Sequence, residues 1–302
     1  MYEFIATAIR DAAPLLWVAL GGLIAFRVGV FTLGLEGLMA IAAFTAVAAA
    51  KATGNVFLAV VIAILVTVAV SVVYWACITV FKGDVIIVGI GLSTVGLTAT
   101  VFMLNVLYGS QATATSPTTL PDPISDGADA GIFSIMGGMS ILVWLLPVVA
   151  FGVWVLLRRS RIGLMMNAVG EFPFAARSAG QSPTKLRLLA LIACGALVAL
   201  GGAQLSLDGL NSFSQDMTAG RGFLAFSAII FGGGTVWGVC GACLFFGFAN
   251  ALGILAQVQG WKLPTEFLLA LPYLLTIVAV TVAAYIAKKT NGSAVSFAEL
   301  RD

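Results

Sequence analysis

The sequence predicts an all-α, polytopic membrane protein with roughly eight to ten transmembrane helices, including broken or half-helices. Of its 302 residues, 61% are hydrophobic and only 9% are charged, and the mean hydropathy is +1.09. A soluble domain carries about 25% charged residues, so most of these side chains face lipid or each other. The apolar residues also form blocks, and a bilayer crossing needs about 20 such residues. We therefore expect a single transmembrane domain over residues 1–302.

Apolar blocks divide the chain, and two interruptions among them are informative. Residues 26–37 carry Arg27 and Glu36 among glycines, and the block at 221–233 is short and ends in three glycines. Both predict broken helices, which are tolerated where protein or water covers the backbone. Broken helices at matching places in two halves are typical of a transporter's substrate site. The blocks lie near residues 12–26, 33–50, 56–81, 85–108, 138–157, 186–207, 221–233, 236–256 and 266–287.

The charges of the loops predict the orientation of the chain. Loop 158–187 holds six of the fifteen Lys and Arg residues and one acid, and short basic loops stay in the cytoplasm. Loop 109–135 has three Asp, three Pro and no Lys or Arg, so we place it outside the cytoplasm. The C-terminal tail carries Lys288, Lys289 and Arg301 and is expected in the cytoplasm. The side of the N-terminus stays open, because it depends on how residues 26–37 are counted.

The basic loop is expected to contain a short helix. Glu171 and Pro173 should begin it, and Gly180 should end it. Ser182 and Pro183 then have the residue types of an N-cap and a first helical residue for the next span. Such a helix is either a connector on the membrane surface or a docking element for a cytoplasmic subunit, and the residues alone favour neither.

Polar side chains inside the apolar blocks are the candidates for a substrate pathway, because they are unfavourable in a membrane. Glu36 is the clearest candidate, and Asn105, Gln204 and Asn250 are uncharged ones. Each also has a structural interpretation. Glu36 could pair with Arg27 or cap backbone amides, and amide side chains commonly join helices by hydrogen bonds. Arg221, flanked by two glycines, is either an interfacial anchor or part of the pathway mouth.

Several kinds of chemistry are excluded or disfavoured. The chain has no His, which removes His proton relays, His metal sites and Ser-His triads. It has no Walker A pattern, so any ATP has to be bound by another polypeptide. Cys240 and Cys243 form a C-x-x-C in apolar sequence, where packing in a membrane helix is favoured over redox or metal chemistry. We therefore expect no catalytic residues and no metal site.

Four stretches of the sequence resemble permease subunits of bacterial ABC importers, in the branch with ribose-type sugar, branched-chain amino acid and nucleoside permeases. These stretches are 29–44 (GVFTLGLEGLMAIAAF), 163–207, 217–252 and 271–278. The chain is most similar to the shorter permease of nucleoside or simple-sugar systems that work with a Bmp-type lipoprotein receptor. It departs from the family pattern at Thr32, where Asn is usual, and at Gly233-Gly234, where a basic residue and Trp are usual.

The resemblance implies that residues 1–302 are one transmembrane permease domain, in which 158–187 is the cytoplasmic coupling loop. It also implies that 171–181 is a coupling helix, which sits in a groove of an ATPase subunit and passes nucleotide-driven closure to the spans. The ATPase-coupling residues that it indicates are Glu171, Phe172, Pro173, Ala176, Arg177, Ala179 and Gly180.

The same resemblance implies the partners and the location. They are an ABC ATPase that binds ATP and Mg, a second permease (a paralogue rather than an identical copy), and an extracytoplasmic substrate-binding lipoprotein. The location is a bacterial plasma (inner) membrane, with the chain crossing it several times. No cofactor is expected in this chain and no nucleic acid as a partner. Transport would proceed by alternating access.

The expected substrate is a small neutral solute, and a nucleoside or nucleobase is preferred because low charge and many aromatic residues suit a neutral ring. The alternatives are a simple-sugar or branched-chain amino acid ABC permease, an ion-coupled secondary transporter, and a channel or scaffold. Ion coupling needs intramembrane carboxylates, and beyond Glu36 the apolar blocks are nearly free of them.

Overall fold

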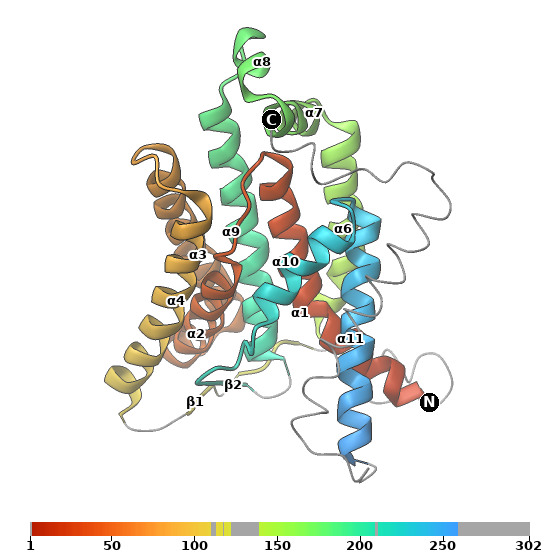
Figure 1. Cartoon of the computed structure of the whole chain (residues 1–302). Coiled ribbons are helices and arrows are strands. Elements are labelled where there is room, and N and C mark those ends of the chain that lie inside the picture. Colours follow the sequence, from red (N-terminus) through yellow and green to blue (C-terminus); the bar gives the residue numbers. More distant parts are fainter. Residues whose placement is uncertain (1, 110–112, 117, 122–138, 209–210, 259–302) are drawn as a thin grey trace.

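A computed structural model describes residues 2–109, 113–116, 118–121, 139–208 and 211–258. Within these ranges, seven helices are long and apolar enough to cross a membrane, and one further apolar helix is shorter. The axes of the long helices are roughly aligned, so that the helices form a bundle (Figure 1). The prediction of an all-α, polytopic membrane protein is therefore confirmed.

The described helices are of two lengths. The long ones are α1 (Tyr2–Arg27), α2 (Leu35–Thr53), α3 (Val56–Thr79), α4 (Val85–Tyr108), α6 (Ile141–Arg159), α9 (Pro183–Leu207) and α11 (Val236–Val258). The shorter ones are α7 (Arg161–Glu171), α8 (Pro173–Ser178) and α10 (Arg221–Phe231). Two three-residue strands, β1 (Thr113–Thr115) and β2 (Ser212–Ser214), form an antiparallel pair.

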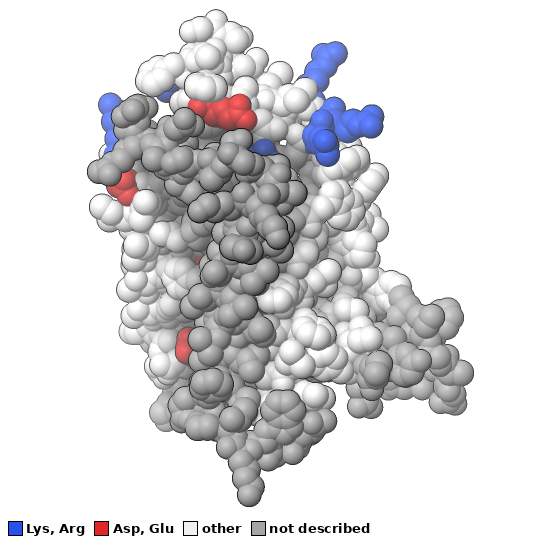
Figure 2. Space-filling model, turned by 45° about the vertical axis from the view of Figure 1, so that its right-hand side comes forward, with Lys and Arg blue, Asp and Glu red and all other residues white. Residues whose placement is uncertain are grey.

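The two ends of the bundle differ in charge and in structure. At one end, α7 and α8 lie beside the adjoining ends of α6 and α9 (Figure 1). At the opposite end, which we call the hairpin end, β1 pairs with β2 and α1 begins (Figure 1). Figure 2 shows Lys and Arg gathered at the first end on the visible face. We call it the basic end, and its Lys and Arg in α6 to α9 are Arg158, Arg159, Arg161, Arg177, Lys185 and Arg187.

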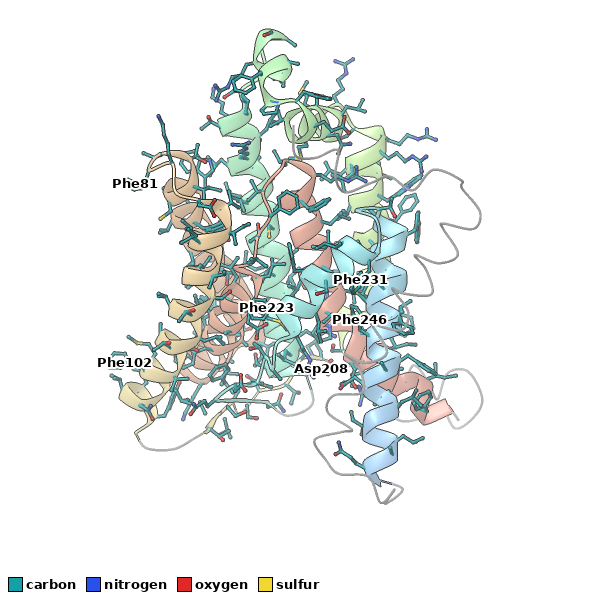
Figure 3. The ribbon with its side chains drawn as sticks, viewed as in Figure 1. Phe81, Phe102, Asp208, Phe223, Phe231 and Phe246 are labelled. Carbon is teal, nitrogen blue, oxygen red and sulfur yellow. The ribbon has the colours of Figure 1, made fainter. Side chains whose placement is uncertain are left out.

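Helices α1, α2 and α9 form the interior of the bundle. The most apolar windows of α1 and α2 are 72% buried, against 28% for α3 and 22% for α4, so α3 and α4 present most of their surface to lipid or to another subunit. Glycine permits close helix approach in the interior. A Cβ added at Gly202 of α9 would lie 2.6 Å from the Ala42 Cβ of α2. On the outside, Phe81 and Phe102 point away from the bundle (Figure 3).

The chain is broken inside the bundle at two places. After α1, residues 28–34 turn back without helical structure, and α2 begins partway along the bundle (Figure 1). Gly29 has the left-handed φ of 78° that this reversal uses. Similarly, α10 begins partway along the bundle and has only 11 residues. The broken helices predicted at 26–37 and 221–233 are therefore confirmed.

The structure differs from the sequence-based expectations in two elements. Helix α1 begins at Tyr2, ten residues before the apolar block, because Arg10 and Asp11 lower the hydropathy without interrupting the helix. In the basic loop, the helix α7 was not expected, and Glu171 is its last residue. The prediction that Glu171 begins the next helix is wrong, because Phe172 is the N-cap of α8 and Pro173 its first residue.

Other expectations fall outside the described residues or are met in part. Ser182 is the N-cap of α9, as predicted, but its side chain makes no capping hydrogen bond. The apolar block at 266–287, the C-terminal tail and most of loop 109–135 lie outside the described residues.

Candidate functional site

Glu36 joins the two broken elements of the fold. It lies in the first turn of α2 and is 1% exposed. Its Oε1 accepts a hydrogen bond from the Gly220 N–H at 3.0 Å, and its Oε2 accepts one from the Gly222 N–H at 2.6 Å. The first amides of a helix have no partners within it and carry partial positive charge. The carboxylate therefore caps α10, which is the amide-capping alternative considered for Glu36 rather than the pairing with Arg27.

Glycine is required on the α10 side of this contact, which we call the Glu36 clasp (Glu36, Gly220 and Gly222). A Cβ on Gly222 would meet the backbone nitrogen and Cα of Glu36, so any other residue would push α2 and α10 apart. Gly220 has a left-handed φ of 78°, a conformation that glycine adopts without strain. The clasp thus fixes the position of the α10 N-terminus inside the bundle.

A cavity of about 500 Å³, lined by both apolar and charged side chains, lies beside the clasp, between α1, α9 and the start of α10. Figure 3 shows Asp208 where the hairpin end of α9 approaches α1, below α10. Arg221, which lies between the two clasp glycines in sequence, also forms part of the wall. The lining residues that matter most for its chemistry are Arg10, Asp11, Gln204, Asp208, Met217 and Arg221.

Hydrogen bonds hold several of these groups in place. The Asn250 amide of α11 donates to Asp11 Oδ2 at 3.1 Å. The hydroxyl of Ser140 donates to Asp208 Oδ2 at 2.9 Å. The Arg221 guanidinium donates to the Met217 carbonyl at 3.2 Å. Residues from α1, α9, α10 and α11 are therefore tied to one polar region.

Gln204 is the exception in this region. It is fully buried in the bundle, and within the described residues neither its Oε1 nor its Nε2 has a hydrogen-bond partner. Buried amides are normally hydrogen-bonded, because leaving one unpaired costs about 1–3 kcal/mol. The described residues therefore do not supply the partners that a buried amide beside this cavity normally has.

The structure brings three of the four predicted pathway residues to one region and separates the fourth. Glu36 contacts the residues on either side of Arg221, Gln204 lines the cavity, and Asn250 holds Asp11. Asn105 instead lies on the exposed face of α4, next to Phe102 on the outside of the bundle.

Sequence reasoning missed three charged residues of the cavity. Arg10 and Asp11 lie inside α1, and Asp208 directly follows α9. Asp11 and Asp208 lie just outside the apolar blocks at 12–26 and 186–207, so the expectation about carboxylates within the blocks did not include them. The available signal was the position of these charges at the edges of apolar blocks. Only the packing of α1 against α9 and α10 shows that they meet.

At the basic end, α8 projects from the bundle (Figure 1). Phe172 is 70% exposed and Phe174 is 81% exposed, whereas Ala176 is buried against the protein. Gly180 follows with a left-handed φ of 80°, and its N–H donates to the Arg177 carbonyl. Of the predicted coupling residues, Glu171, Phe172, Arg177, Ala179 and Gly180 are exposed. Phe174 was not among them, although its exposure makes it the largest apolar contact surface of α8.

Two connections lead from α8 toward the cavity. One is covalent, because α9 starts five residues after α8 and reaches Gln204 near its other end. The other is a packing contact, in which a Cβ on Gly170 of α7 would meet the Arg27 carbonyl and lie 3.2 Å from the Gly29 nitrogen. Residues 28–34 lead from there to Glu36. Helices α7 and α8 are thus connected both to residues 28–34, which precede the clasp, and to α9, which forms part of the cavity wall.

The chain was compared with known proteins. Residues 4–283 match the family described as "Branched-chain amino acid transport system / permease component". The guanosine ABC transporter permease NupQ of Bacillus subtilis is 32% identical over 93% of this chain and 92% of its own length. The nucleoside ABC transporter permease NupC of Lactococcus lactis is 28% identical over 95% of each chain. The ribose import permease RbsC of Escherichia coli is 27% identical over 50% of each chain.

No solved structure matches the chain significantly. The family match nevertheless covers almost the whole bundle, from the first turns of α1 to beyond α11. The bundle also contains the broken helices expected at 26–37 and 221–233, and a short helix projects from its basic end. The chain belongs to the family of ABC transporter permeases that is described as the permease component of branched-chain amino acid transport systems.

Proposed function

We propose that this chain is a membrane subunit of an ATP-driven importer that carries a neutral nucleoside across a bacterial plasma (inner) membrane by alternating access. The guanosine and nucleoside permeases support this, because each aligns over more than nine tenths of both chains. The observation that carries the proposal is the projecting helix α8 with two exposed Phe side chains. A transport subunit without a nucleotide site of its own needs such a contact with an ATPase.

The basic end is proposed to face the cytoplasm. Lys and Arg concentrate there in short connections, which is the pattern of cytoplasmic loops. The hairpin end, with β1 and β2, then faces the extracytoplasmic side, which is also the side proposed for loop 109–135 on its charge. This orientation puts α8 within reach of a cytoplasmic ATPase and the hairpin end within reach of a substrate-binding lipoprotein. The C-terminal tail is proposed to be cytoplasmic on its Lys and Arg content.

In this mechanism, the ATPase subunit holds ATP and Mg and moves α8 when its nucleotide sites close. The force passes along α9, about 37 Å long at 1.5 Å per residue, and through the Gly170 contact to residues 28–34. Both routes end at the elements that enclose the polar cavity. A ligand-loaded lipoprotein biases the same equilibrium from the other side. A second permease, proposed as a paralogue, completes the pathway.

The docking role of α8 is tested by replacing Phe174 with Ser. Buried aromatic anchors dominate the binding energy of interfaces, with losses of about 2 kcal/mol or more on truncation. We therefore expect Phe174→Ser to reduce both recovery of the ATPase with the purified permease and uptake of radiolabelled guanosine by about tenfold or more. Uptake is measured in cells that hold the complete system, and recovery of the ATPase is measured on permease purified from the same cells.

The matched control is Phe81→Ser. Phe81 is 78% exposed, close to the 81% of Phe174, but lies in the turn between α3 and α4 rather than on α8. This variant should keep the ATPase and the uptake. Equal behaviour of the two variants would contradict the assignment of α8 as the coupling helix. Absence of guanosine uptake by the wild-type system would contradict the substrate class.

A simple sugar is the second candidate substrate. The Haloferax volcanii relative is a putative glucose ABC transporter permease, 30% identical over 82% of this chain, and a polar cavity also suits a sugar. Unlabelled nucleosides and sugars are therefore compared as competitors of guanosine uptake. Competition by ribose or glucose at concentrations similar to those of nucleosides would favour the sugar assignment.

A further inference from the structure

The cavity between α1, α9 and α10 has the size of a small-molecule site. Its volume is about 500 Å³, inside the range of about 300–1,000 Å³ that is usual for ligand pockets. Its walls come from elements that are distant in sequence, and hydrogen bonds from Asn250 and Ser140 fix two wall carboxylates. The cavity is therefore a shaped feature of the folded bundle.

The charges in the cavity wall balance. Arg10 and Arg221 contribute two positive charges, and Asp11 and Asp208 contribute two negative ones. A ligand with a phosphate group would meet both carboxylates as well as both guanidinium groups. A neutral ligand with many hydrogen-bond donors and acceptors suits this wall better, because it can bond to both kinds of group without an uncompensated charge.

Gln204 is the observation that points to a ligand. It borders the cavity and is fully buried, and its amide atoms have no partners within the described residues, so a ligand in the cavity would reach them after a rotation of the side chain. A side-chain amide offers a donor beside an acceptor, which is the arrangement that pairs with the edge of a nucleobase. Met217 adds a polarisable apolar surface to the same wall, and methionine makes favourable contacts with aromatic rings.

We propose that this cavity is a nucleoside-binding site within the permease subunit, in which the Gln204 amide bonds to the edge of the base. The proposal rests on the proposed function and adds where the permease itself holds its substrate. The ribose hydroxyls then bond to the Arg and Asp side chains of the wall. Because α9 and α10 form part of that wall, their movement during transport releases the nucleoside.

The test is equilibrium binding of tritiated guanosine to the assembled permease–ATPase complex in lipid nanodiscs, without the lipoprotein, so that the receptor contributes no binding. Gln204→Leu removes the amide and keeps a similar volume. We expect its affinity for guanosine to fall about tenfold or more, the loss that follows when a hydrogen-bonding partner is removed from a buried site. Guanosine should compete for the wild-type site, and guanosine 5′-monophosphate should not.

The matched control is Gln257→Leu, which makes the same chemical change at an exposed position near the end of α11. It should bind guanosine like the wild type. Unchanged binding by Gln204→Leu would overturn the proposal, because guanosine would then not bind through Gln204 in this cavity. Equal competition by the monophosphate would overturn it too, because the charge argument would fail.

Two further measurements, the melting temperature of the complex and guanosine uptake in cells, separate failure of the site proposal from failure of the proposed function. Replacing an unpaired buried amide by an apolar side chain should keep or raise the melting temperature of the complex. Loss of the folded complex in both Gln204→Leu and Gln204→Met would show that the amide has structural partners, and would overturn the proposal. If the wild type takes up guanosine but none binds without the lipoprotein, the site proposal fails and the proposed function stands. If no guanosine is taken up at all, the proposed function fails.

Discussion

At the residue scale, two buried polar side chains have opposite hydrogen-bonding states. Glu36 has both carboxylate oxygens bonded to amides at the α10 N-terminus, and charged hydrogen bonds of this kind contribute about 1.5–3 kcal/mol each. Neither amide atom of Gln204 has a hydrogen-bond partner within the described residues. A partnered group fixes the structure, whereas an unpartnered group is available to a ligand. This contrast is the basis on which we propose a positioning role for Glu36 and a binding role for Gln204.

Gly222→Ala tests the Glu36 clasp. In a helix, alanine is normally more stabilising than glycine by about 1 kcal/mol, but here its Cβ would meet the backbone of Glu36. We expect the clash to outweigh the propensity, with a net loss of about 1–3 kcal/mol and a lower melting temperature of the detergent-solubilised protein. Gly241→Ala in α11 is the control, because no described atom lies within 4 Å of its added Cβ. A melting temperature at or above that of the control would refute the clasp.

At the element scale, α7, α8 and α9 are consecutive helices, and we propose that they act as one lever. Ser160 caps α7 with a hydrogen bond from Gly163 N–H to its side chain at 3.0 Å, and α9 begins at Pro183, whose fixed φ suits a first helical residue. Short, well-defined connections keep these helices from moving independently. The lever contacts the end of α1 through Gly170, at the start of the segment that leads to Glu36.

Gly170→Ala tests this lever apart from docking. The added Cβ would collide with the Arg27 carbonyl, while the exposed surface of α8 stays unchanged. We expect the ATPase to remain bound and guanosine uptake to fall about tenfold, equivalent to roughly 1.4 kcal/mol of lost coupling. Gly152→Ala in α6, with no described atom within 4 Å, should leave both unchanged. Normal uptake by Gly170→Ala would show that force does not pass through this contact.

At the scale of the whole molecule, the two ends of the bundle differ, and this difference is the basis of the proposed orientation in the membrane. The Lys and Arg side chains of α6 to α9 and the projecting α8 lie at one end, and the β1–β2 pair and the cavity lie toward the other. A lipoprotein can deliver substrate near the cavity only if the hairpin end faces the extracytoplasmic side. The orientation is therefore a functional property and can be measured directly.

Cysteine labelling measures this orientation. The four native cysteines, all free in the structure, are first replaced, and single cysteines are then introduced as Thr115→Cys in β1 and Ser178→Cys at the end of α8. Both positions are exposed. A membrane-impermeant maleimide should label Thr115→Cys in intact spheroplasts and Ser178→Cys only after permeabilisation. The reverse pattern would invert the proposed topology.

The sequence by itself determined the class of the protein, its membrane segments and its basic loop. Hydropathy and loop charge are local properties, so they could be read for each segment without knowledge of its neighbours. They predicted the half-helix at 221–233 and the interruption at 26–37, and the resemblance implied a coupling helix close to α8. They misplaced Glu171, because propensity does not determine where one helix ends and the next begins.

Only the tertiary structure decided which polar residues act together. Glu36 and Gly222 are 186 residues apart, and Arg10 and Asp11 of α1 meet Gln204 of α9 only through packing. Asn105 and Gln204 have similar amides in similar apolar sequence, yet one is exposed on α4 and the other is buried in a cavity wall. The physical reason is that a side chain's solvation and partners depend on long-range packing, which a local pattern does not contain.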